Sequence, residues 1–221
     1  MIRFERVTKR YAGGRDGISD LSLQVEAGEL VFVTGHSGAG KSTLLKLIAL
    51  IERPTRGQVL IDGRNIGRLK DREIPAHRRG IGMVFQDHKL LPDRSIFDNV
   101  ALPLIIAGLR QREIGKRVRA ALDQVGLLGR ETSRPEMLST GEQQRVGIAR
   151  AVVGRPPILI ADEPTGNLDP ELSLEIMALF RRLNEVGVTM LIATHDLALL
   201  EPIGGRRLCL AQGQLVMAEA P

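Results

Sequence analysis

Alternating and continuous hydrophobic positions follow one another along the chain and predict an α/β protein. Alternation is typical of half-buried strands, and short β-branched runs are typical of fully buried ones. Strands are expected at 2–8, 21–25, 29–34, 58–62, 81–85, 158–161 and 188–193, with a terminal hairpin of 208–210 and 214–216 around Gln212 and Gly213. Helices are expected at 42–51, 111–125, 170–184 and 196–200. This order of elements indicates a sheet whose central strands are parallel.

The stretch 87–155 lacks the alternating and β-branched hydrophobic runs that are typical of strands. Its sequence Ser95-Ile96-Phe97-Asp98 has the spacing of a capping box, with Asp in place of the usual Glu or Gln. Gly126 follows the expected helix 111–125 and is a natural C-cap. We interpret about 87–155 as a mostly helical insert in a core formed by 1–86 and 156–221, within one domain of 221 residues.

Composition excludes several classes of protein. Hydrophobic residues make up 43% of the chain, which is too many for a disordered protein. No apolar run reaches 18 residues, so no transmembrane helix is expected. Cys209 is the single cysteine, which excludes an internal disulfide and fits a reducing cytosol. Because its neighbours are Leu208 and Leu210, we expect a buried apolar thiol.

The net charge of +5 comes from two local patches. Residues 1–15 hold five basic residues and one acidic residue, and residues 105–135 hold seven basic and three acidic ones, so the remainder is acidic. Aromatic residues make up only 3%, without tryptophan, which argues against platforms for base stacking. We therefore expect no nucleic-acid partner, although a basic balance alone would suggest one.

A glycine-rich loop follows the expected strand 29–34. It consists of Gly35, His36, Ser37, Gly38, Ala39, Gly40, Lys41 and Ser42, followed by Thr43, and fits the pattern G-x-x-x-x-G-K-[ST]. Between a strand and a helix, such a loop points backbone N–H groups at phosphate oxygens. Lys41 is expected to reach the β- and γ-phosphates, and Ser42 to bind Mg2+. The alternative is a glycine turn beside a surface lysine.

Two acidic residues, Asp162 and Glu163, end the apolar strand 158–161. A strand in this architecture delivers them to the carboxyl edge of the sheet, where ligands bind. Asp162 is the expected partner of Mg2+, and Glu163 is positioned to polarise an attacking water. The alternative is that both acids only stabilise the start of a helix. Together with the loop, they indicate a P-loop NTPase.

Further motifs resemble those of ABC-type ATPases. Leu138-Ser139-Thr140-Gly141-Glu142-Gln143-Gln144-Arg145 is similar to the signature motif, Gln86 to the Q-loop, Asn167-Leu168-Asp169 to the D-loop, and His195 to the switch histidine. Tyr11 lies where the family stacks an aromatic ring on adenine. A single Gln, His or Tyr of this kind is usually a loop, structural or surface residue. The resemblance rests on the order in which these motifs follow one another along the chain, and it covers nearly the whole chain.

The resemblance implies an ABC-type nucleotide-binding domain with a mainly parallel core sheet, an antiparallel β subdomain and a helical subdomain. It implies a homodimer that sandwiches two ATP molecules with Mg2+. The signature residues Ser139, Gly141 and Glu142, with Asp169, would close over the phosphate loop of the other subunit. Glu163 would orient water, His195 would contact the γ-phosphate, and Gln86 would sense Mg2+.

Thr140 departs from the family pattern, which usually has glycine there. If this position needs a positive φ, a β-branched residue costs about 1 kcal/mol or more. If φ is negative, Thr is tolerated and could help to cap the helix. We favour tolerance, because Ser139 and Gly141 remain.

Stretches around 34–40, 85–91 and 102–108 resemble the bacterial cell-division branch of the family. That resemblance implies ATP-driven closure, transmitted through an integral membrane partner of the FtsX type to septal peptidoglycan hydrolysis. It also implies a peripheral location on the cytoplasmic face of the inner membrane at the septum, with division-ring proteins as further partners. The alternative is an ATPase subunit of a lipoprotein-release or macrolide-type exporter, which shares 162–169. A nucleic-acid ATPase and a small-molecule P-loop kinase fit the motifs less well.

Overall fold

The computed structural model describes residues 1–14, 16–166 and 168–219. Its strands are β1 (Ile2–Arg10), β2 (Asp16–Val25), β3 (Leu30–Thr34), β4 (Arg56–Ile61), β5 (Arg64–Asn65), β6 (Ile81–Val84), β7 (Ile158–Asp162), β8 (Thr189–Ala193), β9 (Arg206–Ala211) and β10 (Gln214–Glu219). Its α-helices are α1 (Lys41–Ile48), α2 (Ile74–Arg79), α3 (Ile96–Ile106), α4 (Gln111–Gln124), α5 (Thr140–Val152) and α6 (Pro170–Glu185). Four single 3-10 turns accompany them at Ile66–Arg68, Asp71–Glu73, Leu128–Arg130 and Pro135–Met137.

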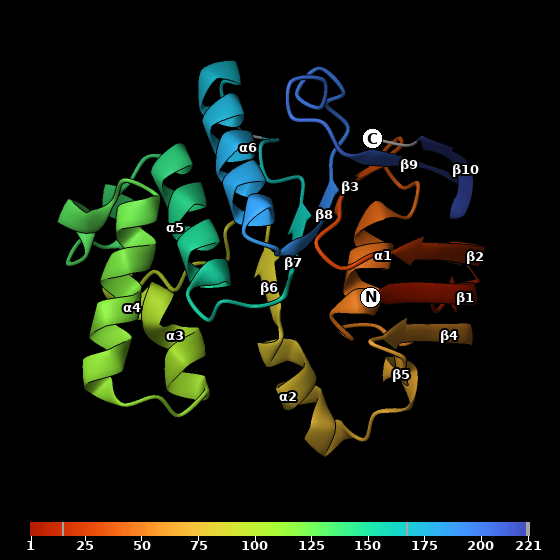
Figure 1. Ribbon diagram of the computed structural model, residues 1–221, viewed down its shortest axis with the longest axis horizontal. Helices are drawn as coiled ribbons and strands as arrows, with labels where there is room; N and C mark the ends of the chain where they lie inside the picture. The colour runs from red at the N-terminus through yellow and green to blue at the C-terminus, as the bar shows by residue number, and fades with distance from the viewer. Residues whose placement is uncertain (15, 167, 220–221) are drawn as a thin grey trace.

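The larger sheet has six strands in the order β10-β9-β3-β8-β7-β6 (Figure 1). The five strands from β9 to β6 pair in parallel, and β10 closes one edge as an antiparallel hairpin partner of β9. Every residue of β3 and of β8 is buried. A parallel sheet covered on both faces requires such continuous apolar runs. The expectation of parallel central strands is therefore confirmed.

The smaller sheet is antiparallel, with the strand order β2-β1-β4-β5. Phe4 on β1 pairs with Leu23 on β2 and with Val59 on β4, and all three side chains are buried. The side chains that precede and follow Phe4 on β1 point to the opposite, solvent side, as in a sheet with one covered face. The antiparallel β part and the mainly parallel core sheet that the resemblance implies are both present.

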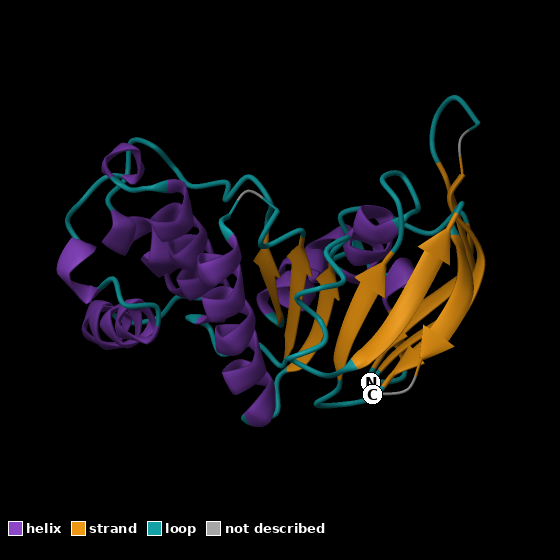
Figure 2. Ribbon diagram, turned by 90° about the horizontal axis from the view of Figure 1, so that it is seen from above, coloured by secondary structure: helices purple, strands orange, loops and turns teal. Residues whose placement is uncertain are grey.

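Helix α1 lies between the two sheets (Figure 1) and joins them through one hydrophobic core. Leu44, Leu45 and Ile48 of this helix pack against the buried side of the small sheet and against one face of the large sheet. The opposite face of the large sheet, with Phe32 of β3, packs against α3 to α6 in a second core. A mostly helical side of the molecule thus stands beside a side built of strands (Figure 2).

Helices α3, α4 and α5 form the stretch in which no strand was expected. Ser95 is the N-cap of α3 and accepts a hydrogen bond from the Asp98 backbone N–H. The Asp98 carboxylate accepts the Ser95 hydroxyl at 2.7 Å and makes no bond to the N-cap backbone, because Asp is shorter than Glu or Gln. Gly126 follows the C-cap of α4 with φ of 70°, as expected for its role.

Three local expectations were wrong. Residues 196–200 form turns, because the Asp196 side chain accepts the Ala198 N–H and Pro202 has no N–H to continue a helix. Helix α1 ends at Ile48, since Leu50 has φ of 51°. Cys209 is only partly buried, because it faces the side of β9 opposite to its two leucine neighbours.

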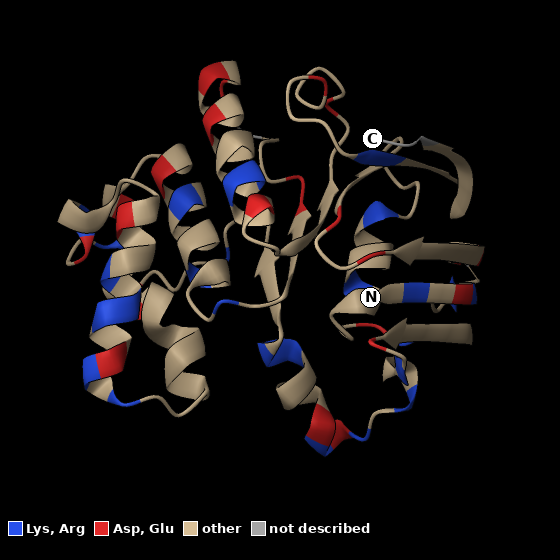
Figure 3. Ribbon diagram, in the orientation of Figure 1, with Lys and Arg blue, Asp and Glu red and all other residues tan. Residues whose placement is uncertain are grey.

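In the described ranges, no helix combines the length and the apolar character that crossing a membrane requires. Lysine and arginine residues are spread over the small sheet, α2 and the helical side (Figure 3). The basic residues are therefore not confined to one element of the fold.

Candidate functional site

The glycine-rich loop joins the end of β3 to the start of α1, as the sequence predicts. Gly40 is the N-cap of α1 with φ of 110°, and a Cβ there would lie 2.5 Å from the Gly17 carbonyl oxygen. Only glycine fits this position. The loop is also tied to the terminal hairpin, because the Gly213 N–H donates to the Ala39 carbonyl at 2.9 Å. The first turn of α1 leaves N–H groups without intrahelical partners at this end of the loop.

Lys41 is the first residue of α1, and its side chain folds back over the loop. Its Nζ donates to the Gly35 carbonyl at 2.7 Å and lies 3.3 Å from Oε1 of Glu163. Only 8% of this side chain is exposed. A buried ammonium group that is held by one carboxylate and by loop carbonyls is a preformed anion contact.

Ser42 and Asp162 meet across the edge of the sheet. The Ser42 hydroxyl donates to Oδ1 of Asp162 at 3.0 Å, and Asp162 is the last residue of β7. Burial raises the pKa of the Asp162 carboxyl above its ordinary value, and the hydrogen bond from Ser42 opposes this effect. The neighbouring negative charge of Glu163 raises the same pKa further.

Glu163 lies between two basic groups. Its Oε1 faces Lys41, and its Oε2 lies 2.8 Å from Nδ1 of His195 and accepts the His195 backbone N–H at 3.3 Å. The backbone of Glu163 has φ of 46°, which is uncommon for a residue with a side chain and costs energy. His195 is 67% exposed, whereas Glu163 is 14% exposed, so the imidazole covers the carboxylate from the solvent side.

Tyr11 and Thr43 close the site on the side of the small sheet. Their hydroxyl groups share a hydrogen bond of 3.2 Å, and Nζ of Lys9 lies 5.2 Å from the centroid of the Tyr11 ring. A cation at this distance is attracted by the face of the ring. The pair therefore holds Tyr11 beside the start of α1.

These groups surround one cavity of about 740 Å3. Its lining consists of Tyr11, Ala12, Asp16, Gly17, His36, Ser37, Gly38, Ala39, Gly40, Lys41, Ser42, Thr43, Gln86, Glu163 and His195. The structure thus brings together the loop, Tyr11, Gln86, Glu163 and His195 from five separate parts of the sequence. Gly35 and Asp162 lie directly behind this lining, through their contacts with Lys41 and Ser42.

The donor set at Ser42 and Asp162 suits a hard divalent cation. Mg2+ prefers oxygen ligands and is usually held by one or two protein groups together with phosphate oxygens. A hydroxyl and a carboxylate already lie 3.0 Å apart, and Asp162 is buried enough for its pKa to rise. A cation beside this carboxylate would relieve the cost of its burial. The residues present therefore fit Mg2+.

The signature residues lie elsewhere in the chain. Ser139 is the N-cap of α5 and forms a capping box with Glu142, in which each side chain accepts a backbone N–H of the other residue. Gly141 packs against Leu172 of α6, and Asp169 is the N-cap of α6. None of these four expected site residues lines the cavity described above. Asn167, which belongs to the D-loop motif, lies outside the described residues.

Four residues at the site were not singled out from the sequence. Ala12, Asp16 and Gly17 line the cavity, and Asp16 pairs with Arg10 at 2.7 Å. Lys9 lies over Tyr11 and forms an ion pair of 2.6 Å with Glu52. An Asp-Gly dipeptide is a local turn signal that could have drawn attention to 16–17. Nothing local in the sequence indicates the contact of Lys9 with Tyr11.

Comparison with known proteins agrees with this geometry. A family model described as ABC transporter matches residues 18–166. The chain is 58% identical over 215 residues to the cell division ATP-binding protein FtsE of Escherichia coli, covering 97% of both chains. It is 44% identical to FtsE of Bacillus subtilis, covering 100% of this chain and 96% of the other.

Solved ABC cassettes have the same fold. A dimeric post-hydrolysis state of the cassette MJ0796, bound to ADP and Pi, superposes with a TM-score of 0.93 at 37% identity, covering 100% of this chain and 98% of that one. CbiO1 from Clostridium perfringens superposes with a TM-score of 0.90 at 31% identity, covering 100% and 88%. The chain belongs to the ABC transporter family and is an ATP-binding ATPase of that family.

Proposed function

We propose that ATP is bound and hydrolysed in the cavity around the glycine-rich loop. The observation that carries this assignment is the cluster of Lys41, Glu163 and His195 at one end of the loop. Lys41 and the loop N–H groups bind the β- and γ-phosphates, and Tyr11 supports the adenine ring. Glu163 accepts a hydrogen bond from the attacking water and aligns it with the γ-phosphate. His195 braces Glu163 and contacts the γ-phosphate.

Mg2+ is part of this proposal. Ser42 and Asp162 hold the ion, with Gln86 at the edge of the cavity as a further oxygen ligand. When bound, the ion neutralises negative charge on the β- and γ-phosphates. The hydrogen bond from the Ser42 hydroxyl to Asp162 holds the two oxygen ligands side by side.

Two copies of the chain form the working unit in this proposal. Ser139, Gly141, Glu142 and Asp169 lie at the starts of α5 and α6, outside the cavity of their own chain. Backbone N–H groups at a helix start are suited to bind phosphate. A second copy placed head to tail would bring these groups onto the γ-phosphate in the first. The dimeric form of the similar cassette MJ0796 supports this arrangement.

The biological role that we propose is in cell division. Similarity to FtsE from several bacteria, at 58% to 40% identity over nearly full length, supports it. An integral membrane partner of the FtsX type would hold the dimer at the cytoplasmic face of the inner membrane, at the septum beside division-ring proteins. Helices within 87–155 would form the unit that contacts this partner, with 1–86 and 156–221 as the nucleotide-binding core. Dimer closure would then activate septal peptidoglycan hydrolases.

A capture experiment tests this role. Tagged Glu163→Gln protein, loaded with ATP and Mg2+, is incubated with detergent-solubilised membranes of the source cell. We expect recovery of an FtsX-like membrane protein with ATP, and much less of it with ADP. Recovery of a lipoprotein or macrolide exporter instead would assign the chain to export. The Lys41→Ala protein is the control, because it lacks the phosphate contact and should recover neither.

A further inference from the structure

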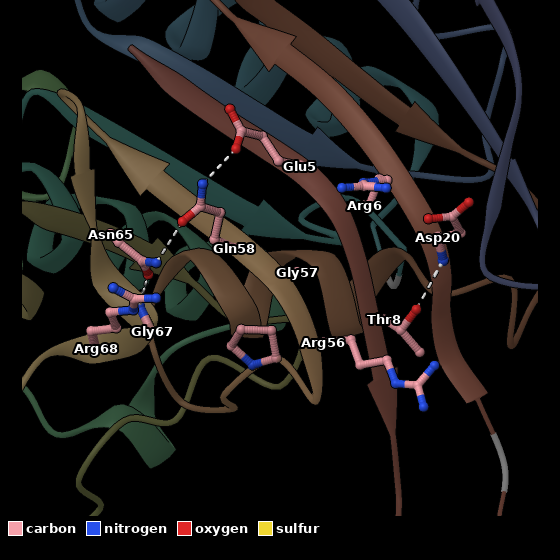
Figure 4. Close-up of a pocket in the computed structure, with 11 residues that line it drawn as sticks. Glu5, Arg6, Thr8, Asp20, Arg56, Gly57, Gln58, Asn65, Gly67 and Arg68 are labelled. Atoms are coloured by element: carbon pink, nitrogen blue, oxygen red, sulfur yellow. Dashed lines mark hydrogen bonds between the residues drawn. The ribbon is translucent and has the colours of Figure 1, made fainter.

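A second large cavity lies on the solvent side of the small sheet, away from the nucleotide. It measures about 790 Å3 and shares no residue with the cavity at the glycine-rich loop. Its lining consists of Glu5, Arg6, Thr8, Asp20, Pro54, Arg56, Gly57, Gln58, Asn65, Gly67 and Arg68 (Figure 4). We call this cavity the arginine groove. The role in ATP hydrolysis uses none of its residues.

Irregularities in two neighbouring strands build the groove. Arg6 on β1 has φ of 45° and Asp20 on β2 has φ of 47°, and the pairing register between the strands shifts beside them. A bulge of this kind places two consecutive side chains on the same face. Arg6 therefore faces solvent next to Glu5, where regular alternation would have turned it into the core.

Side-chain hydroxyl groups accept hydrogen bonds from the bulged backbone. The Arg6 N–H donates to the Ser22 hydroxyl at 3.0 Å, and the Asp20 N–H donates to the Thr8 hydroxyl at 3.1 Å. On the third strand, Gly57 has φ of 74°, and a Cβ there would lie 2.2 Å from the Arg6 carbonyl oxygen. Side-chain hydroxyls and a glycine thus maintain the irregular shape of three adjacent strands, which marks it as a built feature.

A row of hydrogen bonds crosses the groove (Figure 4). Gln58 donates to Glu5, Asn65 donates to the Gln58 oxygen at 2.9 Å, and the Gly67 N–H donates to the Asn65 oxygen at 3.0 Å. Arg68 lies beside Asn65 at one end of this row. Arg6 and Arg56 lie to one side of the row, Arg6 near Asp20 and Arg56 near Thr8. The side-chain amides are held by each other, so the row forms a fixed polar surface.

The three arginines of the groove differ from others in the same sheet. Arg3 pairs with Glu5 at 2.6 Å, and Arg10 pairs with Asp16 at 2.7 Å. In contrast, the guanidinium groups of Arg6, Arg56 and Arg68 form no ion pair or hydrogen bond with the described part of the chain. Each guanidinium group can bind a carboxylate in bidentate geometry, so three of them around one groove are suited to a ligand with several carboxylates.

We propose that the arginine groove binds an acidic peptide segment of a protein partner. The lining has no aromatic side chain and only Pro54 as an apolar one, so it offers no support to a nucleobase or an apolar ligand. The Glu5 carboxylate is already paired with Arg3, but the Asp20 carboxylate lies near Arg6 and would repel a dense anion such as a polyphosphate. A peptide with spaced carboxylates avoids this repulsion, and its backbone N–H groups can donate to Asp20.

Fluorescence anisotropy tests the proposal on the full chain. The probe is a short fluorescein-labelled peptide of alternating glutamate and glycine, with the glutamine analogue as its neutral counterpart, at physiological ionic strength. We expect saturable binding of the acidic probe and none of the neutral one. The triple variant Arg6→Gln, Arg56→Gln, Arg68→Gln should bind the acidic probe at least about tenfold more weakly. This factor corresponds to the summed binding free energy of three exposed ion pairs.

A matched variant separates the groove from general electrostatics. Arg79→Gln, Arg155→Gln, Arg182→Gln removes the same charge from exposed positions outside the groove and should bind the probe as the unaltered protein does. Equal weakening in both triple variants, or no binding of the acidic probe to the unaltered protein, overturns the proposal. Displacement of the probe by inorganic triphosphate at lower concentration than by unlabelled peptide also overturns it, in favour of a phosphate site. Equal melting temperatures and ATPase rates in both variants keep the comparison valid.

Discussion

Lys41 and Glu163 form an ion pair at the base of the nucleotide cavity, with Nζ 3.3 Å from Oε1. The two residues are 122 positions apart in the chain, yet both line the cavity in which we propose that ATP binds. In the proposed binding mode, an incoming γ-phosphate would compete with the Glu163 carboxylate for the ammonium group. We therefore expect ATP binding to loosen this pair and to free the carboxylate for the attacking water.

Replacement of Glu163 by glutamine separates binding from hydrolysis. Glu163→Gln removes the negative charge that competes for Lys41, so ATP affinity should stay equal or rise a few-fold. Hydrolysis should fall by about 100-fold or more, because the amide no longer accepts the proton of water. Phosphate release and fluorescent-nucleotide binding measure the two effects. Glu185→Gln on the surface of α6 is the control and should change neither, and full turnover in Glu163→Gln would remove Glu163 from its proposed role.

The signature glycine has a packing role that can be separated from any role at the nucleotide. A Cβ on Gly141 would lie 2.0 Å from Cδ2 of Leu172. Gly141→Ala should therefore lower the free energy of unfolding by about 1–3 kcal/mol, as overpacked sites do. Leu172→Ala makes room, so the double variant should be destabilised by less than the sum of the single variants. Urea unfolding measures the cycle, and simple additivity would contradict the contact.

The backbone of Thr140 has a conformation that a β-branched residue tolerates. Thr140 is the first residue of α5 and is absent from the described residues with positive φ, while Ser139 provides the N-cap. The tolerance expected for Thr140 therefore holds, although the capping hydroxyl belongs to its neighbour. Thr140→Gly should leave ATPase activity within about twofold and lower stability by about 0.5–1 kcal/mol, the cost of glycine in a helix. A large gain in turnover would show that Thr140 impairs the motif.

His77 should make stability depend on pH. Its Nε2 lies 2.8 Å from the Ile48 carbonyl at the end of α1. Burial lowers the pKa of His77 below its ordinary value of 6.5, the hydrogen bond to Ile48 opposes this effect, and the charges of Arg78 and Arg64 lower the pKa further. Below pH 6.5 the unfolded chain then binds more protons than the folded one, so stability falls as the pH drops from 6.5 toward the folded pKa.

The variant His77→Gln keeps a donor for Ile48 but does not titrate. Its melting temperature should change less between pH 7.5 and pH 5.5 than that of the unaltered protein, and the two pH profiles should run parallel above pH 7. Differential scanning calorimetry in a series of buffers gives both profiles. Identical slopes across the whole range would exclude His77 as the source of the dependence.

The basic patch on α4 should contribute to membrane binding in the proposed location. Arg112 and Lys116 are exposed and pair with no described residue, whereas Arg119 pairs with Glu131 at 3.0 Å and lies 5.9 Å from the centre of the Phe97 ring. Arg112→Glu with Lys116→Glu should weaken sedimentation with anionic vesicles at least about tenfold, since each basic residue near such a surface contributes about 1 kcal/mol. Arg155→Glu with Arg182→Glu is the control. Equal loss in both would show that the effect is not specific to α4.

Much of the nucleotide cavity could be predicted because its parts are local in sequence. A loop that must turn at Gly40 and begin a helix at Lys41 carries its own pattern, and so does an apolar strand that ends in two acidic residues. The parallel order of the strands follows from alternation with helices. The loop, the acidic strand end and the strand–helix alternation each depend on residues that are adjacent in sequence, so their patterns can be recognised without the structure.

Other features depend on contacts between distant segments. The short elements β5 and α2 are too brief for periodicity to reveal them, and the partial burial of Cys209 depends on which face of β9 it occupies. The arginine groove arises from bulges at Arg6 and Asp20. The pattern of hydrophobic residues does not predict the positive φ angles of these two residues.

The strand order has a consequence for how the protein is made. β3, which leads into the phosphate loop, pairs with β8 and β9, so Val33 lies beside Ala193 on one side and Leu208 on the other. A ribosome that has delivered residues 1–185 has synthesised the loop but neither neighbour of this strand. Pairing between such distant segments is slow to form, and unpaired strand edges invite aggregation. We therefore expect nascent chains to remain unable to retain ATP, and dependent on chaperones, until the final segment leaves the ribosome.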